Sequence, residues 1–128
     1  MSLKETLTIM VVDDMSTSRG LITMALEEIG IKKVDFQSNG QDALRAISTR
    51  PVHLVISDYN MPGLDGLQLL ESLRSNKLTS RIGFILVSGK LDETIIATGR
   101  KLGMNNFLRK PFSTAQLRQC LEAVVGKL

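Results

Sequence analysis

Five short apolar runs, each followed by a longer segment with helical periodicity, most limit the possible folds of this chain. The runs are rich in Val, Ile and Leu, and the central ones lack polar alternation, as burial on both faces of a sheet requires. They occupy residues 8–12, 34–37, 53–57, 84–87 and 106–109. The alternation predicts an α/β domain in which a doubly wound, five-stranded parallel sheet carries helices on both faces.

The segments between and after these runs predict five helices. Their apolar stripes fall at about residues 21–29, 43–47, 67–73, 92–102 and 117–125. Asp65 and Gln68 have the spacing of a capping box at the start of the third helix. Ser113 and Gln116 repeat that spacing before the last helix. The fourth helix is the weakest prediction, because Gly99 lowers its helix propensity.

Length and composition exclude several classes of protein. The 128 residues fit a single domain, 1–128, and we expect no attached output domain. No apolar stretch is long enough to cross a bilayer, and no targeting segment is visible. Cys120 is the only cysteine, which suits a reducing cytoplasm. The net charge is +3, but the basic residues are scattered and aromatic residues are few, so we do not expect a nucleic-acid partner. We also expect no membrane partner, and we predict a monomer.

Polar residues gather where the predicted strands end. Asp13 and Asp14 follow the first run, and Asp58 follows the third. Ser88 follows the fourth run, and Lys110 follows the fifth. Taken singly, most of these residues have an ordinary explanation, such as a helix cap, a turn or a surface charge. Because parallel strands share one carboxyl edge, where ligands bind in such folds, we expect all five to converge there.

Three clustered carboxylates repel one another unless a cation lies among them. An all-oxygen site with open positions suits Mg²⁺, which keeps several of its waters. With Mg²⁺ and Lys110 neutralising charge, Asp58 can act as a nucleophile and accept a phosphoryl group. Ser88 and Lys110 would then stabilise the transferred phosphoryl oxygens. The residues thus predict that Asp58 becomes phosphorylated.

Four motifs in order, VVDDMSTSR, VISDYNMPGLDG, ILVSG and LRKPF, are similar to those of the response-regulator receiver family. The resemblance covers nearly the whole chain and implies a flavodoxin-like fold with strand order 2-1-3-4-5. It implies that Asp58 is the phosphoacceptor and that Asp13, Asp14, Asp58 and the backbone carbonyl of Asn60 hold Mg²⁺. It further implies that Ser88 and Lys110 bind the phosphoryl oxygens and that the Lys110–Pro111 peptide is cis.

The resemblance also implies a signalling role. Such a regulator takes its phosphoryl group from a histidine kinase and then binds a partner; for this chain we expect the flagellar motor switch in chemotaxis. A phosphate sink or a phosphorelay shuttle is the alternative. By this resemblance, Phe107 occupies the position of the aromatic residue that moves inward after phosphorylation, and Ser88 is the second residue of this switch. We expect the effector surface on the helix at 92–102, the strand at 106–109 and the last helix, with Leu91, Ile96 and Met104 beside Phe107 in an exposed apolar patch.

Two residues depart from the best-known chemotaxis members in ways that affect rates. Lys90 stands where those members have an acid, and its charge should lengthen the life of the phosphorylated state. Asn60 cannot deprotonate water, so hydrolysis would proceed without a side-chain base. The same asparagine argues against a haloacid-dehalogenase phosphatase, which needs an acid at that position. We therefore expect no enzyme activity beyond the protein's own phosphotransfer and dephosphorylation.

Overall fold

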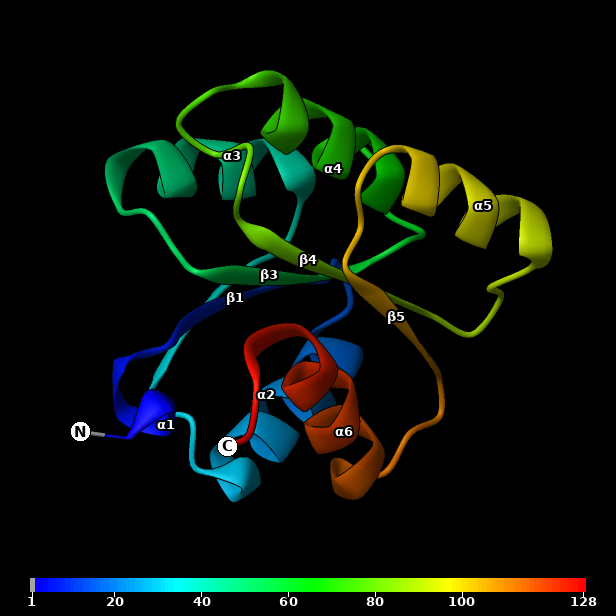
Figure 1. Cartoon of the computed structure of the whole chain (residues 1–128). Helices are drawn as coiled ribbons and strands as arrows, with labels where there is room; N and C mark the ends of the chain where they lie inside the picture. The colour runs from blue at the N-terminus through cyan, green and yellow to red at the C-terminus, as the bar shows by residue number, and fades with distance from the viewer. Residues whose placement is uncertain (1) are drawn as a thin grey trace.

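A computed structural model describes residues 2–128 and contains one five-stranded parallel sheet in the order β2-β1-β3-β4-β5. The predicted α/β architecture and strand order are confirmed (Figure 1). The strands are β1 (Thr8–Val12), β2 (Lys33–Gln37), β3 (Leu54–Asp58), β4 (Gly83–Ser88) and β5 (Asn106–Arg109). The helices are α1 (Leu3–Thr6), α2 (Ser16–Ile29), α3 (Gly40–Thr49), α4 (Gly66–Ser75), α5 (Glu93–Lys101) and α6 (Thr114–Val125).

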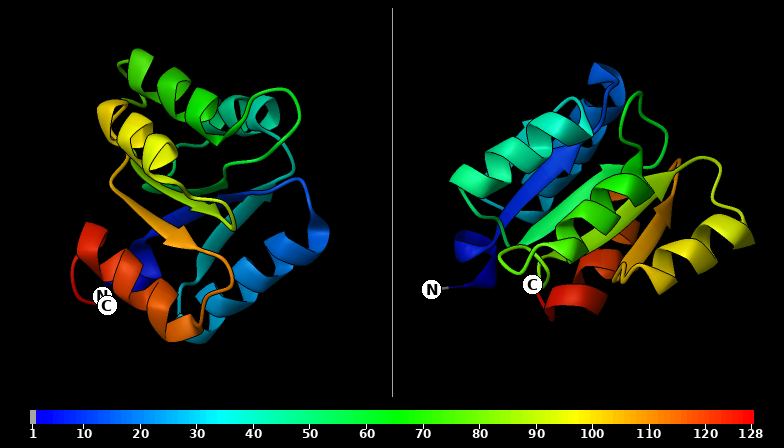
Figure 2. Two further views of the ribbon diagram at one scale, coloured as in Figure 1. Left: turned by 90° about the vertical axis from the view of Figure 1, so that its right-hand side faces the viewer. Right: turned by 90° about the horizontal axis from the view of Figure 1, so that it is seen from above.

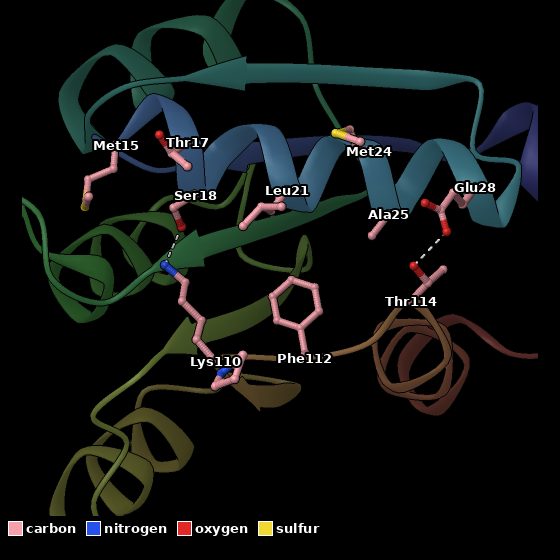
Figure 3. A pocket seen from close by; sticks show the side chains of 11 residues that line it. Met15, Thr17, Ser18, Leu21, Met24, Ala25, Glu28, Lys110, Phe112 and Thr114 are labelled. Carbon is pink, nitrogen blue, oxygen red and sulfur yellow. Dashed lines mark hydrogen bonds between the residues drawn. The ribbon is translucent and has the colours of Figure 1, made fainter.

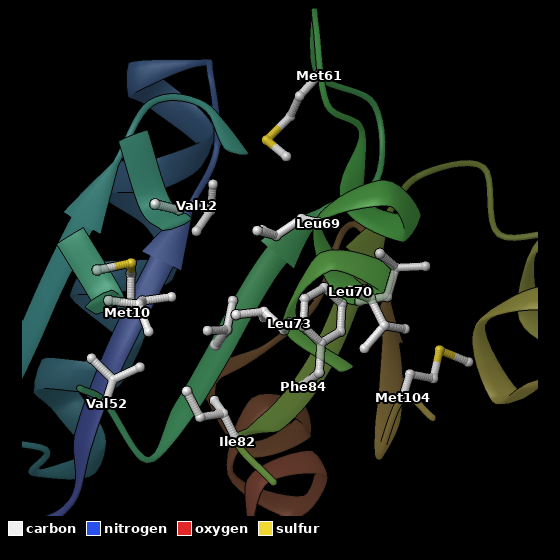
Figure 4. Packing of buried hydrophobic residues seen from close by; sticks show 14 of the residues in the cluster. Met10, Val12, Val52, Met61, Leu69, Leu70, Leu73, Ile82, Phe84 and Met104 are labelled. Carbon is white, nitrogen blue, oxygen red and sulfur yellow. The ribbon is translucent and has the colours of Figure 1, made fainter. Parts of the chain in front are cut away.

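The helices form two layers, one on each face of the sheet (Figures 1 and 2). Helices α3, α4 and α5 cover one face, and α1, α2 and α6 cover the other. Each layer encloses its own apolar cluster, and the cluster under α3, α4 and α5 includes Met10, Leu70 and Phe84 (Figure 4). Every residue of β3 is buried, since this strand lies at the centre of the sheet between two helical layers.

Local sequence determines how the helices begin. Both predicted capping boxes are present: the Asp65 side chain accepts from the Gln68 backbone N–H, and Ser113 accepts likewise from Gln116. Helix α1 was not predicted, because four residues are too few to show a periodic apolar pattern. Strands β3 and β4 also extend by one residue beyond the predicted ends, so Asp58 and Ser88 lie within strands and not after them.

The predicted apolar patch beside α5 is wrong. Leu91, Ile96 and Met104 are buried and belong to the apolar cluster under α3, α4 and α5. The reason is the packing of Met104 against Gly99, where an added Cβ would come within 2.5 Å of the methionine sulfur. The glycine that weakens α5 as a helix therefore makes room for a core side chain.

Two further residues connect elements across the fold. The Arg74 guanidinium on α4 donates to the backbone carbonyls of Ile82 at 2.7 Å and Gly103 at 2.9 Å, and its burial lowers the Arg74 pKa. Cys120 on α6 is buried, its thiol donates to the Phe107 carbonyl on β5 at 3.5 Å, and burial raises the pKa of the thiol to about 11. Within residues 2–128, none of the helices has the length and apolar character needed to cross a membrane.

Candidate functional site

Three carboxylates meet at the carboxyl edge of the sheet. Asp13 and Asp14 follow β1, and Asp58 ends β3, the strand paired with β1. One oxygen from each of these side chains lies within 4.8 Å of the others. Asp13 is fully buried and Asp58 is 7% exposed, whereas Asp14 is exposed. The predicted convergence of these carboxylates is therefore present.

Asp58 is held in a partly desolvated position. Its Oδ1 accepts the Tyr59 backbone N–H at 2.9 Å and lies 3.5 Å from the Lys110 ammonium. Burial raises the Asp58 pKa above its usual range, and the nearby Asp13 carboxylate raises it further. Lys110 and the Tyr59 N–H act in the opposite direction without cancelling this shift. The site thus holds a carboxylate whose negative charge is only partly compensated by the protein.

Glycine at position 66 allows the chain to fold tightly behind Asp58. The Gly66 N–H donates to the Tyr59 carbonyl at 2.9 Å and closes the loop that follows β3. A Cβ at Gly66 would lie 2.5 Å from the Asp58 carbonyl oxygen and 2.7 Å from Leu86. This close approach fixes the backbone from which the Asp58 side chain projects.

Lys110 reaches the same edge from the segment after β5. Its Nζ lies 3.4 Å from Asp13 Oδ2 and 3.5 Å from Asp58 Oδ1. The third neighbour is the Ser18 hydroxyl on α2, at 2.5 Å. The Lys110–Pro111 peptide bond is cis, as predicted. Lys110 thus joins β1, β3 and α2 through a single ammonium group.

Ser88 and its neighbours form the next part of the site. Ser88 ends β4, where Val87 is paired with Asp58 of β3, and its side chain is buried. The Ser88 hydroxyl accepts the Lys90 backbone N–H at 3.1 Å. Lys90 itself is exposed, as is Asn60 in the loop that follows Asp58. In the structure, Ser88 thus ends the strand beside β3, while Asn60 and Lys90 lie in the loops that follow these two strands.

Phe107 lies on β5, one strand away from Ser88. Its ring is half-buried, packs against the core, and stands 5.8 Å from the Arg100 guanidinium and 5.9 Å from that of Arg109. The Arg109 guanidinium also donates to the Leu91 carbonyl, in the loop between β4 and α5. Arginines from α5 and from the end of β5 therefore both lie near the ring, and Arg109 also bonds to the loop beyond Ser88.

Two site residues were missed by the sequence analysis. Ser18 lies in the first turn of α2, and no local pattern in the sequence places it beside Lys110, 92 positions away. Arg19 donates to the Asp13 carbonyl at 2.9 Å and stacks on Phe36 at 4.9 Å. The ordinary explanation of Asp14 as a helix cap is also not realised, because α2 has Met15 at its N-cap and Asp13 Oδ1 accepts the Met15 N–H.

The donor set fits a hard divalent cation. The cluster offers only carboxylate oxygens, and two of its three members are buried, so their mutual repulsion favours a bound cation. The exposed Asp14 leaves the cluster accessible from the solvent. Mg²⁺ suits this arrangement because it binds a few carboxylates and keeps several waters.

Comparison with known families identifies the domain that carries this site. The response regulator receiver domain matches residues 9–122, which include all three carboxylates and Lys110. The chain belongs to the response-regulator receiver family. As a receiver domain it is a signalling protein of the CheY-like type and not an enzyme of the usual kind.

Its relatives agree with this assignment. The "Probable chemotaxis protein CheY" of Rhizobium etli is 37% identical over 128 residues, covering all of this chain and 99% of that protein. A response regulator structure from Chloroflexus aurantiacus superposes with a TM-score of 0.88 at 26% identity, covering 94% of this chain and 98% of the other. The receiver domain of the Pseudomonas aeruginosa sensor histidine kinase PA1611 shares the fold, with a TM-score of 0.84 at 24% identity over 94% of this chain and 98% of that one. That structure has a magnesium ion coordinated in its active-site cleft.

Proposed function

We propose that this receiver domain accepts a phosphoryl group from a histidine kinase on Asp58 and then binds an effector in a phosphorylation-dependent manner. The observation that carries the proposal is the placement of Asp58. It is a buried carboxylate at the end of the central strand, beside two further carboxylates and the Lys110 ammonium. No structural role accounts for so much uncompensated charge in one place, because burial of charge destabilises a fold.

The transfer is a displacement at phosphorus. A carboxylate oxygen of Asp58 attacks, and a new P–O bond forms as the P–N bond to the donor histidine breaks. The bonding electron pair stays on the imidazole nitrogen, which takes up a proton. The Tyr59 N–H already holds Oδ1 at 2.9 Å, so the orientation of the carboxylate is determined by the backbone before the donor arrives.

Mg²⁺ would be held by Asp13, Asp14, Asp58 and the backbone carbonyl of Asn60. When bound, the ion neutralises the carboxylates and the charge that develops on the phosphoryl oxygens. Lys110 supplies the protein's own positive charge at the same place, and the Ser88 hydroxyl donates to a phosphoryl oxygen. The magnesium ion of the Pseudomonas aeruginosa relative supports this part of the proposal.

Phosphorylation is coupled to partner binding through Ser88 and Phe107. The Ser88 hydroxyl turns from the Lys90 N–H toward the phosphoryl group, and the Phe107 ring moves into the space that opens. The effector surface consists of α5, β5 and α6. Since Leu91, Ile96 and Met104 are buried, the change that a partner recognises is one of shape around Phe107. The flagellar motor switch is the proposed partner, supported by the chemotaxis name of the Rhizobium etli relative.

Labelling with a small phosphodonor tests the proposal. The protein is incubated with acetyl phosphate and Mg²⁺, and the modified residue is mapped by mass spectrometry. We expect one phosphoryl group on Asp58, none on the Asp58→Asn variant, and none on wild type when EDTA replaces Mg²⁺. Stable labelling of Asp58→Asn would refute the assignment. Binding of the motor switch protein, with and without beryllofluoride, then separates motor regulation from a phosphate sink or shuttle, neither of which binds it.

A further inference from the structure

We propose that Ser18 is a positioning residue, which holds the Lys110 ammonium at the site and thereby sets the rate at which Asp58 is phosphorylated. This inference rests on the proposed function for its effect on rate, but not for the position of the lysine. Figure 3 shows the Ser18 side chain on α2 and the Lys110 side chain pointing toward one another, with their hydrogen bond drawn.

The distances around Nζ show which neighbour holds the ammonium most closely. A lysine ammonium has three donors, and Lys110 has three oxygen neighbours among the described residues. Ser18 Oγ lies at 2.5 Å, while the oxygens of Asp13 and Asp58 lie at 3.4 and 3.5 Å. Charge-assisted bonds between ammonium and carboxylate are usually about 2.7–2.9 Å long. The uncharged hydroxyl is therefore the closest partner of the ammonium, and both carboxylate contacts are longer than usual charge-assisted bonds.

Ser18 is well suited to act as a fixed point. Its hydroxyl is only one torsion away from the backbone, and it lies in the first turn of α2. That turn is anchored to Asp13, whose carboxylate accepts the Met15 N–H at 3.0 Å and whose carbonyl accepts Arg19 at 2.9 Å. Lys110, in contrast, has a flexible four-carbon stem.

A groove beside Lys110 offers its side chain an alternative position. Its stem lines a groove of about 620 Å³ between α2 and the segment before α6, and Ser18 lines the same groove (Figure 3). At this end of the groove the Lys110 ammonium also lies close to Asp13 and Asp58. The groove is otherwise lined largely by apolar residues, including Met15, Leu21 and Phe112. Without the Ser18 hydroxyl, the stem can turn along this groove and carry the ammonium to the solvent. The preorganised charge beside Asp58 is then lost.

The test follows the position of the lysine and the rate of phosphorylation separately. In protein labelled with ¹⁵N-lysine, an NH₃⁺ signal is visible only where hydrogen bonding slows exchange with water. Lys110→Arg identifies which signal belongs to Lys110. We expect this signal in wild type and in Ser18→Thr, which keeps the hydroxyl, and its loss in Ser18→Ala. Thr17→Ala is the matched control, because Thr17 is exposed in the same turn and lines the same groove.

The rate of Asp58 labelling by acetyl phosphate is measured on the same variants. Ser18→Ala should be slower by about tenfold, the effect of one charged hydrogen bond, with Ser18→Thr and Thr17→Ala close to wild type. In a Lys110→Arg background, Ser18→Ala should change the rate much less, since Ser18 acts through the lysine. A Lys110 signal that persists in Ser18→Ala overturns the positioning role. A lost signal with an unchanged rate overturns its effect on phosphorylation. Failure of wild type to become labelled overturns the proposed function instead, and the NMR result still decides where the lysine is held.

Discussion

Gly66 packs directly against the peptide of Asp58, and an added Cβ would lie 2.5 Å from the Asp58 carbonyl oxygen. Gly66→Ala should therefore destabilise the protein by about 1–3 kcal/mol, the usual cost of overpacking. It should also slow phosphorylation, because Asp58 must shift with its backbone. Urea unfolding measures the first effect and labelling by acetyl phosphate the second.

Gly89→Ala is the control for this prediction. Nothing lies within 4 Å of a Cβ at Gly89, so this variant should be as stable as wild type or more stable by about 0.4–1 kcal/mol. Equal stability of Gly66→Ala and Gly89→Ala would show that the close approach at Gly66 has no energetic consequence.

The raised pKa of Asp58 predicts how stability changes with pH in metal-free protein. The folded state keeps the Asp58 proton to a higher pH than the unfolded state, whose pKa is about 3.9. Stability from this group is therefore present below about pH 4 and is lost as pH rises through the folded pKa. Asp58→Asn should be more stable than wild type at pH 7 in EDTA, with the advantage shrinking toward pH 4. Thermal melts of wild type and Asp58→Asn across this pH range measure the difference in stability. A difference that does not change with pH would contradict the prediction.

Binding of Mg²⁺ should depend on Asp13 and Asp14, because each supplies an oxygen or its supporting charge to the cluster. At a Mg²⁺ concentration one hundred times the Kd, binding stabilises wild type by about 2.7 kcal/mol. Asp13→Asn and Asp14→Asn should lose most of this gain in thermal melts. Glu71→Gln, which removes an exposed carboxylate from α4, should keep it. An equal metal-induced shift in all four proteins would exclude the site.

Lys90 should lengthen the life of the phosphorylated state, because it places an exposed positive charge two residues after Ser88, in the loop that follows β4. Lys90→Glu should dephosphorylate roughly fivefold faster, the effect of about 1 kcal/mol of charge interaction. Loss of label after removal of acetyl phosphate gives the rate. Lys77→Glu, in the loop between α4 and β4, makes the same charge change at a distance and should behave as wild type. A rate for Lys90→Glu no faster than wild type would remove Lys90 from this role.

The Phe107 ring, which lies near Arg100 and Arg109, should act by its shape. Phe107→Ala should bind the effector equally well with and without beryllofluoride, because no ring moves. Phe107→Tyr should keep most of the phosphorylation-dependent gain, since the wild-type ring has no hydroxyl to contribute. Amide exchange with and without beryllofluoride locates the change. Protection confined to α2 and α3, with residues 88–109 unaffected, would place the switch elsewhere.

The sequence predicted most of this fold because strand burial and helix capping are local properties. The β1 and β5 boundaries and both capping boxes followed from residue type and spacing alone. The carboxylates were found because parallel strands share one carboxyl edge. Met104 was wrongly assigned to the surface because the space that it fills exists only where Gly99 has no side chain, and the sequence pattern does not reveal this space. Ser18 was missed because its contact with Lys110 joins residues 92 positions apart, which no local pattern reveals.

The long separation between the site residues ties signalling to folding. Lys110 meets Asp13 across 97 positions of the chain and Ser18 across 92. Contacts of such high sequence separation form only when the intervening strands have taken their places in the sheet. A chain still emerging from the ribosome, or one cut before β5, presents Asp58 without its lysine. Under the proposed function, phosphorylation of Asp58 therefore requires the segment after β5 to be in place, and a chain without that segment should be a poor phosphoryl acceptor.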